Sequence, residues 1–390
     1  MMINKKKLGM FVIFIIILII NIPIPFFLKF NNLKNTYNIM QILIFIFLLI
    51  LLMKNRYIEK MFILICLYYI SYIFSTFINS GSIEYCLYIM KCMIPCINLI
   101  SLIFLFYKKY NKQLLAATSI FLIVAIIINF VTILLFPDGL YIGNNTNEHY
   151  FLGQRNDLIE YILPCLLCFS IYNFKYKTSK LIFCIFNLIC MFSVILTWSA
   201  NAMTALTIYY VYLFFFYIKK KDNVFSPLNI YLISFFTSYS IIILKIQNLF
   251  SWIIEGILHK NLTFTGRTSI WDKSIAYIKK SFLYGYGKES EIIKFYKIGH
   301  SNSCHNYFLD FLYDGGILMF IIILFIIITL NKSYKNKCVD DKAKTIVSSI
   351  FIGYFIIGIA TPIHLNTICY LFYSLYMLKY FLEEKVQNEK

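Results

Sequence analysis

The sequence predicts an all-α polytopic integral membrane protein. Hydrophobic residues make up 60% of the 390 residues, and charged residues only 14%. The apolar residues form long runs, which is typical of helices that cross a bilayer and untypical of soluble domains. We therefore expect a single integral membrane domain over residues 1–390, located in the cell membrane.

Apolar runs with polar turns between them predict roughly twelve transmembrane helices. In chain order they cover residues 8–28, 37–53, 61–78, 85–107, 114–136, 158–174, 181–198, 202–218, 228–246, 307–330, 346–361 and 365–380. Three lysines precede the first run, as in a signal peptide. The run is too long for such a peptide and lacks a small-residue cleavage site, so we expect a retained helix.

The net charge of +18 is explained by lysine clusters in every second turn. These clusters alternate with turns that contain few cations, which is the positive-inside pattern. The pattern places the N-terminus and a tail at residues 381–390 in the cytoplasm, and it explains the charge without a nucleic-acid partner. Cys165 and Cys168 lie inside one apolar run, where their spacing indicates packing and not a redox pair.

Residues 248–303 then form one long extracytoplasmic loop. Arg267 and Trp271 begin an amphipathic helix in it, because apolar residues recur at helical spacing while charged residues fall on another face. We expect this helix to lie on the membrane surface and to end at Gly285 and Gly287. Its apolar residues are Ile270, Trp271, Ile275, Ile278 and Phe282.

A polar segment follows and leads into the apolar run 307–330. Ser301 or Ser303 is expected to cap the next helix, so that His305 and Asn306 lie in its first turn. There the helix dipole would keep the imidazole neutral and able to accept a proton. A hydrogen-bonded anchor at the membrane interface is the alternative role for His305.

Arginine is rare in the chain and is concentrated on the outer side. Two of the three arginines, Arg155 and Arg267, lie in predicted outer loops. A guanidinium offers a planar pair of donors to phosphate oxygens, so these positions predict a ligand that carries phosphate. A solvated loop cation is the alternative for each. The histidines lack metal-ligand spacing and the outer loops lack paired aspartates, so we predict no metal and no cofactor.

Three segments of the chain, within residues 130–330, resemble the bacterial O-antigen ligase and O-antigen polymerase family. The family pattern of Arg, Trp, Gly-x-Gly, His-Asn, Leu and Gly is matched by Arg267, Trp271, Gly285, Gly287, His305, Asn306, Leu309 and Gly315. A Gly and an Asn that lead into a span are similar to Gly153 and Asn156. A third element, Thr or Ser followed by Ser-Arg, is similar to Thr197, Ser199 and Asn201, where the arginine is missing.

This resemblance implies a membrane glycosyltransferase on the outer face of the bacterial cytoplasmic membrane. Members of the family polymerise or ligate oligosaccharide repeat units carried on undecaprenyl diphosphate, for capsule, O-antigen or related polysaccharide of the cell envelope, without a metal. We expect inverting transfer with His305 as base and with Arg267 and Arg155 on the diphosphate. Either Arg155 replaces the arginine missing at Asn201 or the role of that arginine is lost. The supporting positions are Trp271, Asn306, Asn156, Gly285 and Gly287. Membrane lipid, a chain-length regulator and a flippase are further expected partners.

A polytopic transporter or flippase of lipid-linked oligosaccharide is the alternative function. Such a carrier is expected to have repeated halves, broken helices and ionisable groups at mid-membrane. The sequence has no internal repeat and offers Lys91 and little else at that depth. A structural membrane protein with a binding loop is the third possibility, and it would leave the arginine and histidine positions without a function.

Overall fold

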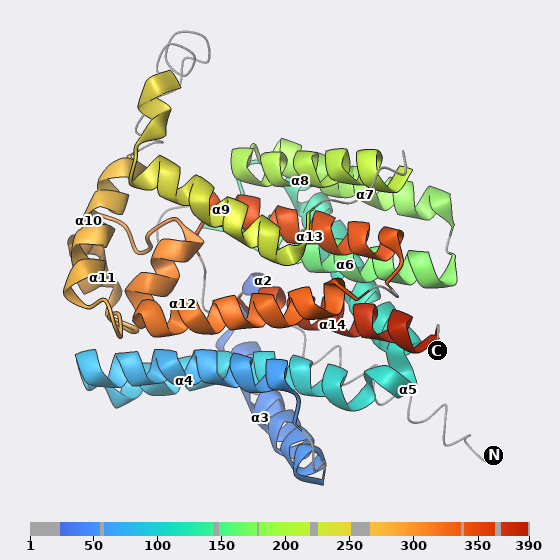
Figure 1. The fold of residues 1–390 in the computed structure, drawn as a ribbon, viewed down its shortest axis with the longest axis horizontal. Helices are drawn as coiled ribbons and strands as arrows, with labels where there is room; N and C mark the ends of the chain where they lie inside the picture. The colour runs from blue at the N-terminus through green and yellow to red at the C-terminus, as the bar shows by residue number, and fades with distance from the viewer. Residues whose placement is uncertain are drawn as a thin grey trace.

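The computed structural model describes residues 24–54, 58–142, 148–177, 179–218, 225–250, 266–336, 339–362 and 368–388. Most of its helices run side by side between two ends of the molecule (Figure 1). The described α-helices are α2 (Pro25–Leu28), α3 (Asn31–Lys54), α4 (Lys60–Ser80), α5 (Ile83–Leu135), α6 (Leu158–Tyr176), α7 (Lys180–Leu196), α8 (Ala200–Leu213), α9 (Pro227–Ile242), α10 (Arg267–Lys280), α11 (Glu291–Lys297), α12 (Tyr307–Tyr334), α13 (Asp341–Ala360) and α14 (Ile368–Asn388). A π-helical turn (Phe214–Ile218) extends α8, and a 3₁₀ turn (Ile246–Phe250) follows α9.

Six of the described helices are long and apolar enough to cross a membrane, namely α3, α4, α5, α6, α12 and α13. The shorter apolar helices α7, α8 and α9 lie at three further predicted spans. Helix α5 joins two predicted spans, and its backbone leaves the helical region between them at Tyr110 (φ −132°, ψ 30°). Most of the first predicted span lies outside the described residues, and the number of crossings stays a prediction.

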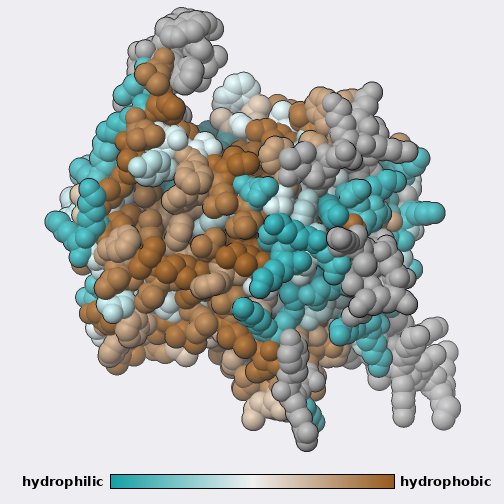
Figure 2. Space-filling model, viewed as in Figure 1, coloured by the Kyte–Doolittle hydropathy of each residue, from teal (hydrophilic) through white to brown (hydrophobic). Residues whose placement is uncertain are grey.

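The surface has the polarity of a protein embedded in a bilayer. Figure 2 shows an apolar band between hydrophilic residues at the two ends of the molecule. Large apolar side chains stand exposed on several helices, for example Leu43 (57%), Ile70 (55%) and Ile185 (49%). Water would make this exposure unfavourable, whereas lipid chains solvate it. The chain is a multi-pass membrane protein, as its composition predicts.

The start of α4, the bend of α5, the end of α6 and the C-terminal half of α14 meet at one end of the bundle. The Tyr376 hydroxyl donates to Glu59 Oε2 (2.6 Å) there, and Lys175 Nζ donates to Tyr107 Oη (3.4 Å). The rings of Tyr107 and Tyr380 lie 5.2 Å apart. We name this the basic end, because the lysine clusters of the bend and of α6 lie beside these contacts.

The other end, here named the loop end, carries α10 and α11 (Figure 1). The starts of α6, α8 and α12 meet the ends of α9 and α13 there, through hydrogen bonds described below. These helices therefore alternate in direction between the two ends. That alternation is the arrangement the lysine pattern predicts.

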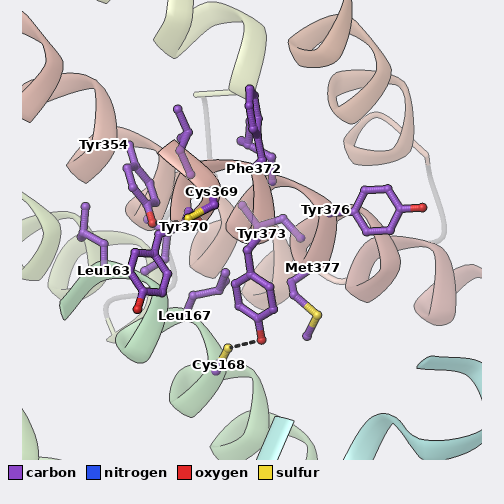
Figure 3. Close-up of a cluster of buried hydrophobic side chains, with 14 of the residues drawn as sticks. Leu163, Leu167, Cys168, Tyr354, Cys369, Tyr370, Phe372, Tyr373, Tyr376 and Met377 are labelled. Carbon is purple, nitrogen blue, oxygen red and sulfur yellow. Dashed lines mark hydrogen bonds between the residues drawn. The ribbon is translucent and has the colours of Figure 1, made fainter. Parts of the chain in front are cut away.

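Helix α14 lies in the middle of the bundle, and every side chain from Ile368 to Leu382 is buried (Figure 3). The ring of Phe372 lies 4.9 Å from that of Tyr68 on α4. Tyr373 Oη lies 3.3 Å from Cys168 Sγ on α6, and Cys165 and Cys168 are fully buried free thiols, as predicted. The helix continues to Asn388, through most of the residues expected to form a tail.

A small antiparallel sheet precedes α6, which the all-α fold class does not predict. Its strands are β1 (Tyr141–Ile142), β2 (Glu148–Tyr150) and β3 (Gly153–Gln154), in the order β1-β2-β3. Tyr141 pairs with His149, and Tyr150 pairs with Gly153. Asp157 Oδ2 then accepts a hydrogen bond from the Gln154 N–H (2.9 Å) in the turn that leads into α6.

Candidate functional site

Asn306 connects three helices at the loop end. Its carboxamide oxygen accepts hydrogen bonds from the N–H groups of Phe308 (3.0 Å) and Leu309 (3.1 Å), which caps α12. Its carboxamide nitrogen donates to Ser238 Oγ on α9 (3.1 Å) and to the Ile359 carbonyl on α13 (3.0 Å). The side chain is fully buried, so these four bonds form away from water and fix the start of α12.

The predicted cap at Ser301 or Ser303 is wrong. Ser301 Oγ donates instead to the Ser303 carbonyl (2.8 Å) and closes a turn ahead of the helix. His305 consequently lies outside α12, directly before the cap, and not in the first turn. Its φ of +51° is in the left-handed region, which is uncommon for residues other than glycine and costs backbone strain. An asparagine amide can accept the cap bonds and donate to two further groups at once, whereas a serine hydroxyl has a single donor.

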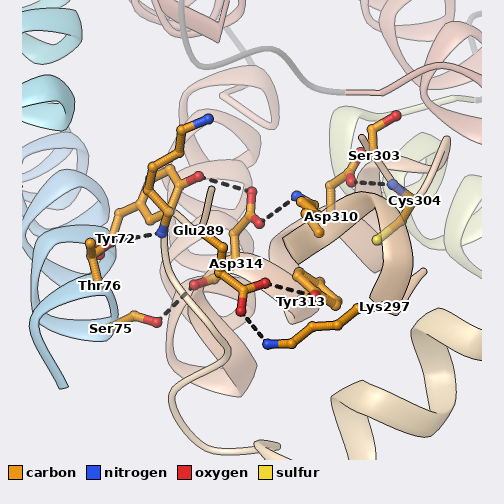
Figure 4. Close-up of polar contacts among 12 residues, drawn as sticks. Tyr72, Ser75, Thr76, Glu289, Lys297, Ser303, Cys304, Asp310, Tyr313 and Asp314 are labelled. Carbon is orange, nitrogen blue, oxygen red and sulfur yellow. Dashed lines mark hydrogen bonds and ion pairs between the residues drawn. The ribbon is translucent and has the colours of Figure 1, made fainter. Parts of the chain in front are cut away.

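Both neighbours of His305 are anchored. The Cys304 N–H donates to Asp310 Oδ1 (2.9 Å), in the first turn of α12 (Figure 4). Cys304 is fully buried, and Asp310 is 3% exposed. Burial raises the pKa of the Cys304 thiol, so the thiol stays a neutral packing group. His305 itself is half-buried between this bond and the Asn306 cap.

Trp271 packs α10 onto the segment that carries His305. Its side chain is 2% exposed and belongs to an apolar cluster separate from the main core of the bundle. The cluster contains Ile242, Trp271, Ile278, Ile298, Cys304, Leu309 and Tyr313. The helix predicted from Arg267 therefore exists, and the protein itself covers the side chains of Trp271 and Ile278.

Arg267 is the first residue of α10 and lies one helical turn before Trp271, on the same face. Its side chain is half-buried, and no carboxylate among the described residues forms an ion pair with it. Burial lowers the pKa of Arg267, but a guanidinium remains charged at neutral pH. A partly desolvated cation one helical turn from Trp271, whose side chain packs with Cys304, is suited to bind an anion.

Helix α12 is broken next to this cluster. Gly316 has φ +64° and ψ −162°, so the backbone leaves the helical conformation there. The carbonyls of the preceding turn accept hydrogen bonds from the loop, since the Tyr286 N–H donates to Tyr313 O (2.7 Å) and the Gly287 N–H to Asp314 O (2.8 Å). The loop thereby forms a backbone bridge to the broken helix.

Gly285 and Gly287 make this bridge possible. They were predicted to end α10, which ends earlier, at Lys280. Their φ values are +69° and +68°. A Cβ on Gly285 would lie 2.6 Å from Tyr313 O, and a Cβ on Gly287 would overlap the backbone of Thr76 on α4. Both positions require glycine because of a close backbone approach.

Asp314 is enclosed by α4, α11 and α12 (Figure 4). Its Oδ1 pairs with Lys294 Nζ (2.9 Å), and the Tyr72 hydroxyl donates to its Oδ2 (3.2 Å). Burial acts to lower the pKa of Lys294, but the attraction of Asp314 more than offsets it, so the pKa lies above its ordinary value. Beside this pair, Glu289 forms an ion pair with Lys297. These contacts attach α11 to the bundle.

The corner between α6 and α8 holds the other two motif segments. Asn156 Oδ1 accepts a hydrogen bond from Ser199 Oγ (2.8 Å). Asn201 Nδ2 donates to the Ile357 carbonyl on α13 (3.2 Å) and to the Thr361 hydroxyl. Asn156 is exposed, and so is its neighbour Arg155. The position that lacks the family arginine is therefore joined to the segment that carries Arg155.

The last turn of α13 connects the corner between α6 and α8 to the start of α12. It accepts hydrogen bonds from Asn201 at Ile357 and from Asn306 at Ile359. The structure thus brings the predicted segments to one end of the bundle, although no contact within its described part joins Arg155 to Arg267 directly. The sequence did not predict that the end of α13 belongs to the site. An apolar helix gives no signal in its sequence that marks which of its carbonyls accept hydrogen bonds from other helices.

Two buried carboxylates at this end were also missed. Glu160, in the first turn of α6, is 5% exposed, and Asp310 is 3% exposed. Each is an acidic residue inside an apolar run, and such a residue at the end of a span is a signal for a functional position. The sequence prediction followed the cations and the histidine and did not use this signal.

A family model described as O-antigen ligase matches residues 185–324. The matched segment runs from α7 to the middle of α12, so it contains Asn201, Arg267, Trp271 and His305, whereas Arg155 lies before it. No curated protein matches the chain. The family match confirms the resemblance to the O-antigen ligase and O-antigen polymerase family that the motifs predict.

Proposed function

We propose that the chain transfers an oligosaccharide from undecaprenyl diphosphate to a hydroxyl acceptor, as a polymerase or ligase of a bacterial surface polysaccharide. The observation that carries the proposal is the convergence of three motif segments at the end of α13. Asn201 and Asn306 both donate to carbonyls there, and Asn156 joins them through Ser199. Polar residues from separate segments that meet at one end of an apolar bundle favour a site over a purely structural loop.

His305 is the proposed general base. It takes the proton of the acceptor hydroxyl while that oxygen forms a bond to the anomeric carbon of the donor sugar. The bond from this carbon to the diphosphate oxygen breaks on the opposite side, and its electron pair leaves with the diphosphate, so the configuration inverts. Assistance by a base of this kind accelerates a reaction roughly a hundred- to ten-thousandfold. No metal takes part in this scheme.

Arg267 and Arg155 are proposed to bind the diphosphate. Arg267 is half-buried one helical turn before Trp271, whose side chain packs with Cys304. Arg155 is exposed next to the hydrogen bond between Asn156 and Ser199. Because that bond leads to Asn201, Arg155 can supply the guanidinium that this segment lacks. Fixed cations at a leaving diphosphate stabilise its developing charge by about 3 kcal/mol each.

An apolar groove between α9 and α13 supports a lipid-linked donor. Its cavity volume is about 270 Å³. The lining residues are Phe225, Ile230, Ile233, Ser234, Thr237, Ile352, Phe355, Ile356 and Ile359. At the loop end of the bundle, the groove is lined by Thr237 and Ile359. These residues lie next to the Ser238 hydroxyl and the Ile359 carbonyl, which accept hydrogen bonds from Asn306. The groove has room for only the part of a polyprenyl chain nearest the phosphates, and a chain seated there would place its diphosphate at the His305 segment.

The groove is tested by filling it with Ile356→Trp. We expect the KM for a full-length polyprenyl donor to rise at least about tenfold, because the chain loses buried contacts, while kcat changes little. A donor that lacks the polyprenyl chain should be affected far less. Ile185→Trp, on the exposed face of α7, is the matched control. Equal changes for both donors would contradict the placement of the chain.

The reaction itself is tested with purified protein in lipid nanodiscs, supplied with undecaprenyl-diphosphate-linked oligosaccharide. A polymerase produces a ladder of glycan lengths, and a ligase transfers the glycan to a different acceptor. We expect His305→Ala to lower the rate at least about a hundredfold and His300→Ala, at an exposed position, to leave it unchanged. A full ladder from His305→Ala excludes the base role, and movement of intact donor across liposomes without glycan transfer favours a transporter.

A further inference from the structure

The peptide before His305 is fixed by a buried carboxylate. Asp310 is 3% exposed, and its Oδ1 accepts the hydrogen bond from the Cys304 N–H at 2.9 Å (Figure 4). The Asp310 N–H donates to the Asn306 carbonyl (2.9 Å), so the carboxylate stands on a regular helical turn. Breaking a buried hydrogen bond of this kind costs about 1–3 kcal/mol, because the N–H is left without a partner away from water. The bond is therefore able to hold a strained neighbour.

His305 is such a neighbour. Its left-handed backbone, with φ +51°, is disfavoured by roughly 1–2 kcal/mol relative to the right-handed region. The Asn306 side chain fixes the peptide on its C-terminal side, through Ser238 and Ile359. Asp310 fixes the peptide on its N-terminal side, through Cys304. These two restraints determine the direction in which the imidazole leaves the backbone.

We propose that Asp310 is a positioning residue that orients His305 through the Cys304 amide. The proposal rests on the proposed function, because the orientation of the imidazole matters for rate only if it accepts the proton. A misplacement of about 1 Å at a reacting group lowers the rate by up to about a hundredfold. The effect belongs to kcat, since the diphosphate is bound by other groups.

Two variants separate the hydrogen-bond acceptor from the charge. Asp310→Asn keeps an oxygen that can accept the Cys304 N–H, and Asp310→Leu keeps a similar volume without an acceptor. We expect Asp310→Leu to lower kcat about ten- to a hundredfold with little change in KM, and Asp310→Asn to restore most of that loss. Asp272→Asn and Asp272→Leu, at the exposed ion pair with Lys245 (2.8 Å), are matched controls and should change neither constant. Wild-type kcat in Asp310→Leu, or equal losses in both Asp310 variants, would overturn the proposal.

Amide hydrogen exchange distinguishes this proposal from the proposed function. The Cys304 amide is expected to exchange slowly in wild-type protein and in Asp310→Asn, and at least about tenfold faster in Asp310→Leu, as measured by mass spectrometry in detergent. Thermal unfolding of each variant controls for loss of the fold. This exchange pattern without any glycan transfer by wild-type protein would reject the proposed function and keep the anchoring of the His305 segment. Slow exchange in Asp310→Leu would overturn the anchoring itself.

Discussion

The two arginines at the loop end differ in how far the protein removes them from water. Arg155 is exposed, whereas Arg267 is half-buried, and burial lowers its pKa. A guanidinium that has already lost part of its hydration gives up less on binding a diphosphate, and its attraction to the anion is screened less. We therefore expect Arg267 to contribute more to donor binding than Arg155.

Replacement of Arg267 by Lys tests whether the planar guanidinium matters. Lysine keeps the charge and loses the paired donors, so we expect kcat/KM for the lipid-linked donor to fall about ten- to a hundredfold, and further in Arg267→Ala. Arg155→Lys should cause the smaller loss. Steady-state kinetics with purified protein provide the measurement, and near-normal activity of Arg267→Lys would argue against bidentate binding.

The place of His305 and Asn306 at the start of a span was predictable, but the residue that caps the helix was not. A His-Asn pair ahead of an apolar run indicates a polar site at the start of a span. The choice of Asn306 as the cap depends on Ser238 and Ile359, which come from two other helices. A local pattern contains no such partners, so it favours the serines that precede the helix.

At the scale of the element, α12 and the loop form one unit. The break at Gly316 leaves carbonyls of the preceding turn without their helical hydrogen bonds. The N–H groups of Tyr286 and Gly287 in the loop donate hydrogen bonds to these carbonyls. The same contact that completes the helix therefore fixes the loop between Arg267 and His305, and a disturbance of one is expected to disturb the other.

Gly287→Ala tests this unit. Alanine at φ +68° is strained, and its Cβ would overlap the Thr76 backbone, so we expect a loss of about 3 kcal/mol or more in the free energy of unfolding. Gly81 has a similar φ of +60° with nothing within 4 Å of an added Cβ, so Gly81→Ala should cost only about 1 kcal/mol. Unfolding in detergent measures both. Equal losses would show that backbone strain alone determines the effect.

The ion pair of Lys294 with Asp314 supports a second prediction about this unit. The two side chains are only 14% and 16% exposed, so Lys294→Met leaves a buried carboxylate without its cation. We expect a loss of about 2–4 kcal/mol in the free energy of unfolding. Lys245→Met breaks an exposed pair (43% and 51%) and should cost less than about 1 kcal/mol. Adding Asp314→Leu to Lys294→Met should recover part of the loss, and no recovery would contradict this account.

At the scale of the whole molecule, charge and hydropathy predict the alternation of the helices because both are set by the membrane. The length of an apolar run determines where a span lies, and lysine clusters mark every second turn between consecutive spans. The central place of α14 was not predictable, because a helix surrounded by protein needs no lipid-facing side. The small sheet before α6 was also missed, since its strands of two or three residues are too short for a periodic pattern.

The orientation of the bundle is the remaining prediction at this scale. Lysine alternation places the loop end outside the cytoplasm, where a lipid carrier would present its diphosphate to Arg267. A cysteine in place of the exposed Lys279 on α10 should react with a membrane-impermeant maleimide in intact cells. A cysteine in place of Lys335, at the end of α12, should react only after the cells are permeabilised. Unmodified protein gives the background from native thiols such as the exposed Cys184. The reverse labelling pattern would place His305 and both arginines on the cytoplasmic side, and it would remove the basis for transfer to an extracytoplasmic acceptor.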